Sequence, residues 1–136
     1  MRFLDANVFI YAFSKPARFL DATAVSLKKK AAQILRELED GCTSVVHLSE
    51  AANVIADLSG EEHARNAMSA ILDTPSIHVL GVSREDYALA VELSSQSSAG
   101  VNDCLAVMLM HANGIKEIYS FDREFDSFAG ITRLEE

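Results

Sequence analysis

The sequence predicts an α/β fold with a mainly parallel central sheet of four to five strands. Short apolar segments typical of buried strands alternate along the chain with longer segments that have helical spacing. With 136 residues the chain is expected to form one domain, residues 1–136, whose core needs no disulfide framework. Hydrophobic residues make up 49% of the chain and charged residues 24%, which excludes disorder as its main state.

The first half of the chain is organised by apolar spacing and by the breaks that Gly41 and Gly60 introduce. The predicted order is a strand at 2–5, an apolar stretch at 8–13, a helix at 22–40, a strand at 43–46 and helices at 47–58 and 61–72. In the 47–58 helix the expected core face is made of Leu48, Ala51, Ala52, Ile55 and Leu58, which leaves Glu50 on the opposite side.

The second half repeats the alternation. The predicted order is a strand at 77–80, a helix from 83 to about 97, an apolar helix at 102–113, a strand at 117–121 and a fifth strand at 131–134. Ser83 is an expected helix N-cap because Asp86 follows three residues later, and Asn113 with Gly114 is an expected C-cap.

The net charge of −8 argues, taken alone, against a nucleic-acid partner, because phosphate is attracted to lysine and arginine. The charge is unevenly distributed, however. Residues 1–36 hold seven basic and two acidic residues, and residues 37–136 hold five basic and eighteen acidic residues. The lysine run Lys28, Lys29 and Lys30 is either a solvated helix face or a guide for an RNA backbone.

The sequence predicts a cytoplasmic protein with no membrane partner. The longest apolar run, Cys104 to Met110, is far shorter than the roughly 18–20 residues of a membrane span, and Asp5 interrupts the apolar N-terminus. Cys42 and Cys104 form no C-x-x-C pair, so they are expected to be small buried side chains in a reducing compartment.

Two aspartates follow predicted strands. Asp5 ends the first strand and Asp122 follows the strand at 117–121. Because the carboxyl ends of parallel strands lie at one edge of a sheet, the two side chains are expected to meet in one crevice. Aspartate is also a common turn and cap residue, and for either residue alone that explanation is equally good.

Two further acids lie on helices. Asp103 begins the most apolar helix, where helix capping alone would explain it, although an acid there would also lie near the middle of the molecule. Glu50 lies either on a solvated helix face or on the wall of an acidic cleft, and periodicity does not separate the two.

Carboxylates are hard oxygen ligands, and four of them could hold Mg²⁺ or Mn²⁺ for phosphodiester hydrolysis without a nucleophilic side chain. Phosphate-binding loops, the H-E-x-x-H zinc motif and the G-x-S-x-G elbow are absent from the sequence. His47, His63, His78 and His111 have no ligand spacing, so they are expected to be structural or exposed.

Four segments together resemble PIN domains, especially VapC-type toxin ribonucleases. They are F-L-D-A-N-V-F-I-Y at the start, S-V-V-H-L-S-E-A-A-N, V-N-D-C-L-A-V and Y-S-F-D-R-E-F-D. Each is weak alone, but their order and their places at the ends of elements are fairly specific. The resemblance implies a three-layer fold and an endoribonuclease that uses Mg²⁺ or Mn²⁺ and leaves a 5′-phosphate and a 3′-hydroxyl.

The same resemblance assigns roles to individual residues. It implies that the catalytic and metal-binding acids are Asp5, Glu50, Asp103 and Asp122. It gives supporting roles to Asn7, which would orient Asp5 or a water molecule, and to Ser120, which would hydrogen-bond within the acidic cluster. Asp126 is either an additional acid of the site or a solvated residue. Members of the family often form homodimers, and the toxins are inhibited by a cognate antitoxin.

Three alternatives stay open. A PIN domain can act in RNA processing without an antitoxin, and it can be a non-catalytic module for RNA docking or dimerisation. A phosphatase acting on small phosphate esters is a third possibility. It is disfavoured because Asn7 stands where many such enzymes have a second aspartate.

Overall fold

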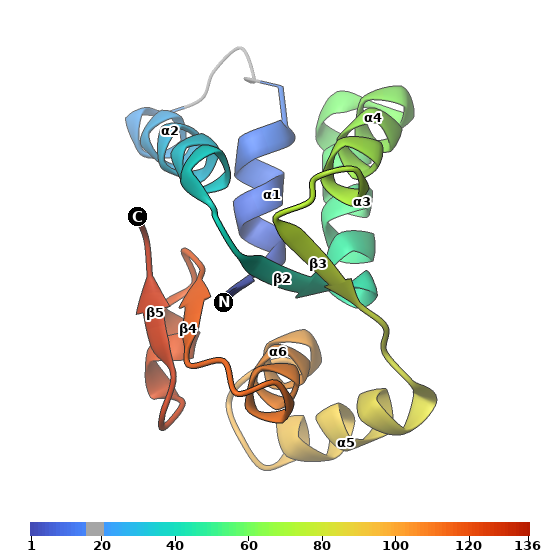
Figure 1. Cartoon of the computed structure of the whole chain (residues 1–136), viewed down its shortest axis with the longest axis vertical. Helices are drawn as coiled ribbons and strands as arrows, with labels where there is room; N and C mark the ends of the chain where they lie inside the picture. The colour runs from blue at the N-terminus through green and yellow to red at the C-terminus, as the bar shows by residue number, and fades with distance from the viewer. Residues whose placement is uncertain (16–20) are drawn as a thin grey trace.

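The chain is built around a five-stranded sheet in which every neighbouring pair of strands is parallel. The computed structural model describes residues 1–15 and 21–136 (Figure 1). The strands lie in the order β3-β2-β1-β4-β5 across the sheet. Their bounds are Arg2–Leu4 for β1, Gly41–Ser44 for β2, Ile77–Leu80 for β3, Glu117–Tyr119 for β4 and Thr132–Leu134 for β5.

Helices cover both faces of the sheet, which gives the three-layer architecture that the sequence predicted (Figure 1). One face carries α1 (Ala6–Phe13), α2 (Ala22–Glu37), α3 (Val45–Ser59) and α4 (Glu61–Leu72). The other face carries α5 (Arg84–Ser95), α6 (Val101–Ala112) and the short 3₁₀ helix η1 (Arg123–Ser127). None of the helices in the described part of the chain has the length and apolar character needed to cross a membrane.

The two core layers meet at the central strand β1. Leu4 packs among the side chains of α1–α4, whereas its neighbour Phe3 faces the layer of α5 and α6, and both are fully buried. This alternation is what a strand of a sheet covered on both faces requires. Cys42 and Cys104 are free and buried in the second layer, as the sequence predicted.

Several element boundaries differ by one or two residues from the sequence prediction, because cap residues set them. The strand expected at 43–46 is Gly41–Ser44, since the Ser44 hydroxyl accepts a hydrogen bond from the backbone N–H of His47 and so starts α3 at Val45. In the same way Asp5 ends β1 and begins α1.

Other caps follow the prediction. Ser83 and Asp86 form a reciprocal capping box at the start of α5. Gly60 separates α3 from α4 and has a φ of 93°, a backbone conformation that glycine adopts more easily than other residues. The prediction for Leu58 is wrong: it is 62% exposed, because it lies in the last turn of α3 beyond the edge of the core.

The order of the strands brings the carboxyl ends of β1 and β4 together at one edge of the sheet. From β1 the chain passes outward through β2 to β3 along one direction, then returns through α5 and α6 to place β4 on the other side of β1. The carboxyl ends of β1 and β4 are therefore neighbours, and the backbone N–H of Asp5 donates to the carbonyl oxygen of Tyr119 over 3.1 Å. Ligand sites in parallel sheets lie at such a reversal of strand order.

Candidate active site

Asp5 lies at this edge of the sheet and is almost entirely buried, with 6% of its surface exposed. It is held at both carboxylate oxygens. Oδ1 accepts a hydrogen bond of 2.8 Å from the backbone N–H of Ala6, and Oδ2 accepts one of 2.7 Å from the hydroxyl of Ser120. The carboxylate is therefore fixed by β1, the start of α1 and the end of β4.

Ser120 connects the two strand ends. Besides donating to Asp5, its hydroxyl oxygen accepts from the Nδ2 of Asn7 over 3.1 Å and from the backbone N–H of Asp122 over 3.0 Å. Asn7 also accepts a hydrogen bond from the backbone N–H of Phe121 through its Oδ1. Asn7 thus acts on Asp5 through Ser120, and it fastens α1 to the loop after β4.

Burial and neighbouring charges raise the pKa of Asp5 to about 7. Burial is the largest cause, because it disfavours the charged carboxylate, and the charges of Asp103 and Glu50 add to it. The hydrogen bonds from Ser120 and Ala6 oppose the shift, since they stabilise the charged form. Glu50 of α3 and Asp103 of α6 also line one shallow depression at the surface.

Burial also raises the pKa of Asp103, to about 6. The charges of Asp122, Glu124 and Glu50 raise it further. The charges of Asp103 and Glu50 act on Asp5, and the charges of Glu50 and Asp122 act on Asp103, although the four acids come from four different elements or their ends. Asp122 has a cap function as well, because its Oδ1 accepts from the backbone N–H of Glu124 over 2.9 Å.

The chemistry of these donors fits a hard divalent cation. Carboxylates that repel one another and have raised pKa values would be stabilised in their charged form by Mg²⁺ or Mn²⁺. Within residues 1–15 and 21–136, no three side chains of histidine, cysteine, aspartate or glutamate converge closely enough to hold a metal ion. The Asp5 carboxylate is buried and fixed by its hydrogen bonds, whereas the Glu50 side chain is exposed at the surface of α3.

Asp126 lies apart from this cluster. The guanidinium of Arg133 donates to both of its carboxylate oxygens, over 2.9 and 3.2 Å, and this bond lowers the pKa of Asp126. Arg133 also binds Glu135 and the carbonyl oxygen of Ser120. The structure thus gives Asp126 a partner on β5, and Glu124 is the η1 acid that acts on Asp103.

The three lysines are separated by their environments. The ammonium group of Lys28 donates to the carbonyl oxygens of Tyr11, Ala12 and Ser14, in the last turn and at the C-cap of α1. These bonds give Lys28 a structural role at the end of α1. Lys29 is exposed on α2. The pKa of Glu135 is lowered chiefly by the hydrogen bond from Arg133 and further by the charge of Lys30.

For His47 the sequence predicted only a structural or exposed side chain. Its Nδ1 lies 2.7 Å from the hydroxyl of Ser44 and its Nε2 lies 3.1 Å from the carbonyl oxygen of Asn102. A carbonyl oxygen only accepts, so Nε2 donates to Asn102. Burial lowers the pKa of His47 to about 4, so the ring is neutral near neutral pH and Nδ1 accepts from the hydroxyl of Ser44. The ring also packs edge-on against Phe3. His47 therefore joins the start of α3 to the start of α6.

Neither His47 nor Glu124 had a signal that composition or spacing could have revealed. Glu124 lies two residues after Asp122, in the same motif as Asp126, and only the path of η1 decides which of the two acids faces Asp103. The role of His47 depends on a contact between residues 55 positions apart.

The protein has a parallel α/β sheet with acidic side chains at its carboxyl edge. This arrangement is typical of α/β proteins whose sites use carboxylates at the ends of strands and helices. The sequence profile of the PIN domain matches residues 2–131, so the chain belongs to the PIN domain family. No curated protein matches the chain.

Solved structures share the fold. VapC20 of Mycobacterium tuberculosis, described as a sarcin-ricin loop cleaving toxin, has a TM-score of 0.76 at 18% identity over 96% of this chain and 98% of that one. A toxin–antitoxin complex from Klebsiella pneumoniae has a TM-score of 0.65 at 15% identity, covering 97% and 96%. VapBC2 from Rickettsia felis, bound to a DNA fragment from the promoter, has a TM-score of 0.65 at 14% identity. The match covers 98% of this chain and 96% of that chain. At these identities the similarity establishes the fold.

Proposed function

We propose that the protein is a Mg²⁺- or Mn²⁺-dependent endoribonuclease and the toxin of a type II toxin–antitoxin pair. The observation that carries this proposal is the acidic cluster, in which neighbouring acids help to raise the pKa of Asp5 and of Asp103 to about 7 and about 6. Raised carboxylate pKa values in a crevice are typical of functional sites. Membership in the PIN domain family supports the same reaction class.

In this proposal the cation is held by Asp5, Glu50, Asp103 and Asp122. When bound, Mg²⁺ or Mn²⁺ would supply positive charge that activates water for attack on a phosphodiester and neutralises the charge developing on the phosphate. The expected products carry a 5′-phosphate and a 3′-hydroxyl.

The chain's own residues orient this site. Ser120 and the N–H of Ala6 hold the Asp5 carboxylate in one direction, and Asn7 holds Ser120. This fixed geometry would limit the reorganisation needed when RNA and a cation bind. Lys28, Lys29 and Lys30 remain candidates for contact with the RNA backbone, and the ammonium group of Lys28 also donates to carbonyl oxygens at the end of α1.

A hydrophobic groove supports the antitoxin partner. A cavity of about 400 Å³ opens between α1, α2 and α3, and its walls are mainly apolar, with Ile10, Tyr11, Ala24, Val54 and Leu58 among its lining residues. Asn7 lies at one side of it. A segment of an antitoxin seated in this groove would therefore end beside the acidic cluster. The solved toxin–antitoxin complexes that share the fold support this proposal.

We further propose a homodimer in the cytoplasm. Leu89 and Leu93, four residues apart and therefore on one face of α5, are 47% and 38% exposed, and a partner would cover them. The two free cysteines agree with a reducing compartment. Light scattering after size exclusion would give the oligomeric state directly.

Nuclease activity is tested by incubating the purified protein with structured RNA and Mg²⁺ or Mn²⁺. We expect cleavage that EDTA abolishes and that Asp5→Asn reduces by about 100-fold or more, since loss of even a residue that only supports a metal ligand costs about 10–100-fold. Asp57→Asn, on the exposed side of α3, is the matched control.

Equal cleavage by wild type and Asp5→Asn would exclude the proposed site. If several structured RNAs, including ribosomal RNA, stay intact with either metal, the nuclease proposal is wrong. Inhibition of cleavage by the protein encoded next to this one would support the toxin assignment, and absence of such a neighbour would favour RNA processing.

A further inference from the structure

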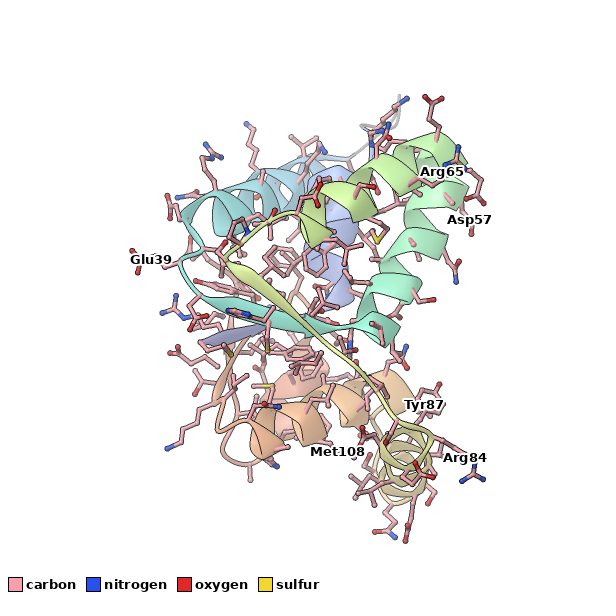
Figure 2. The ribbon with its side chains drawn as sticks, turned by 45° about the vertical axis from the view of Figure 1, so that its right-hand side comes forward. Glu39, Asp57, Arg65, Arg84, Tyr87 and Met108 are labelled. Carbon is pink, nitrogen blue, oxygen red and sulfur yellow. The ribbon has the colours of Figure 1, made fainter. Side chains whose placement is uncertain are left out.

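A second cavity lies beside the acidic cluster, between the start of α3 and the first half of α5. Its volume is about 470 Å³. Tyr87 of α5 forms one wall, and α3 contributes Val45, Ser49, Glu50 and Asn53. In Figure 2 the labelled Tyr87 lies on the side of α5 towards α3, while Arg84 points away from the molecule. The Tyr87 side chain is 41% exposed, so its ring is accessible.

The polar side chains of this cavity are free to bind a ligand. Within the described parts of the chain, the side chains of Ser49, Asn53 and Asn102 make no hydrogen bonds, and neither does the hydroxyl of Tyr87. The backbone of Asn102, in contrast, is fixed by the hydrogen bond from His47. The cavity therefore combines a positioned frame with unused donors and acceptors.

The cavity adjoins the proposed reaction site. Glu50 and Asn102 also line a separate depression of about 330 Å³, whose other residues are Gly100, Val101 and Asp103. One depression holds two of the four acids, and the other holds the aromatic ring. A nucleic acid whose phosphate lies at the acids would therefore have a neighbouring nucleotide at Tyr87.

We propose that Tyr87 stacks on an unpaired base of the RNA substrate, adjacent to the phosphate that is cleaved, while Asn53 and Asn102 bind the edge of that base. This inference rests on the proposed nuclease function. Aromatic rings are the usual stacking partners of splayed-out bases in single-stranded RNA, and amide side chains offer both a donor and an acceptor to base edges.

Binding of RNA is measured separately from cleavage by placing each variant in the Asp5→Asn protein. The probe is a short, fluorescein-labelled single-stranded oligoribonucleotide of mixed sequence, followed by anisotropy in Mg²⁺. We expect Tyr87→Ala to weaken binding by about tenfold, since stacking on one aromatic ring contributes about 1–3 kcal/mol per base. Tyr87→Phe is expected to bind as tightly as its parent, because it keeps the ring.

A matched control is Leu72→Ala, because Leu72 is a large exposed apolar residue at the end of α4 that does not line this cavity. A second readout uses 2-aminopurine placed at successive positions of the RNA. We expect its fluorescence to be quenched at one position by the parent and by Tyr87→Phe, and to be restored by Tyr87→Ala.

The possible results separate the inference from the proposed function. Cleavage of RNA by wild type together with unchanged binding and unchanged quenching in Tyr87→Ala would overturn the stacking role and leave the nuclease function intact. Position-specific quenching without cleavage of RNA would support the stacking role of Tyr87 and overturn the nuclease function. Equal losses in Tyr87→Ala and Tyr87→Phe, or loss of the dimer in Tyr87→Ala, would assign Tyr87 to hydrogen bonding or to assembly and would overturn the inference.

Discussion

Asp5 is a carboxylate that folding buries among other acids, so it opposes the stability of the metal-free protein. Its pKa is about 7 in the folded protein, against an ordinary value of 3.8. Between these two pH values the folded state binds a proton more tightly than the unfolded chain. The contribution of Asp5 to stability is therefore fully present below about pH 4 and is lost as the pH rises through 7.

We expect Asp5→Asn to be more stable than wild type in EDTA at about pH 8, and its advantage to grow by on the order of 2 kcal/mol between about pH 5 and pH 8. The asparagine removes the buried charge and can still accept from Ala6, although it fits the Ser120 hydroxyl less well. Urea unfolding at both pH values measures this, with Asp57→Asn as the exposed control. A variant that is less stable than wild type at about pH 8 would contradict the assigned charge repulsion.

At the level of elements, single side chains join neighbouring helices by hydrogen bonds to backbone carbonyl oxygens. His47 connects α3 to α6 through Asn102, and so sets the position of Glu50 relative to Asp103. Its hydrogen-bonding groups are satisfied in the neutral form, because Nε2 donates to the carbonyl oxygen and Nδ1 accepts from Ser44. Protonation in the buried site is disfavoured, and the pKa of about 4 is below the ordinary 6.5.

The stability that neutral His47 contributes is fully present above about pH 6.5 and is lost as the pH falls towards 4, because the unfolded chain then binds the proton more tightly. We expect the difference in unfolding free energy between wild type and His47→Gln to shrink over this range by about 2–3 kcal/mol. Chemical unfolding at a series of pH values tests this, and the exposed His111→Gln is the control. A difference independent of pH would mean that folding does not shift the pKa of His47.

Lys28 has an equivalent function at the end of α1, where three carbonyl oxygens share its ammonium group. We expect Lys28→Met to lower the free energy of unfolding by about 1–2 kcal/mol, since a hydrogen bond to a charged group contributes about that much. Methionine keeps most of the apolar stem of lysine, so the variant removes the charge and retains the packing of the stem. Thermal unfolding of Lys28→Met beside Lys29→Met measures it, and equal stability of the two variants would contradict the cap.

For the whole molecule, a net charge of −8 is compatible with an RNA substrate when a cation binds the acids at the carboxyl edge. A ligand that binds only the folded state stabilises it by mass action. We expect Mn²⁺ at about 100 times its Kd to raise the unfolding free energy of wild type by about 2.7 kcal/mol. Asp5→Asn combined with Asp103→Asn should abolish the effect. Calorimetric scans with Mn²⁺ and EDTA test this, and equal stabilisation of both proteins would place the cation elsewhere.

The sequence by itself determined the α/β class, the alternation of strands and helices, and the four acids at the ends of elements. These features depend on local order: apolar period, cap residues such as Ser83, and the positions of Asp5 and Asp122 directly after strands. The boundaries at Ser44 and Asp5 differed slightly, since a polar residue that ends a strand can also begin a helix.

Only the tertiary structure decided which partners the individual polar side chains have. The sequence left open whether Lys28 and Asp126 belong to the site, and in the structure Lys28 donates to carbonyl oxygens of α1 and Arg133 donates to Asp126. His47 and Glu124 act on the site through contacts that close only when α6 packs beside β1, and their pattern in the sequence is that of ordinary helix residues. The physical reason is that periodicity assigns a residue to a face of its own element, whereas its partner depends on elements distant in the chain.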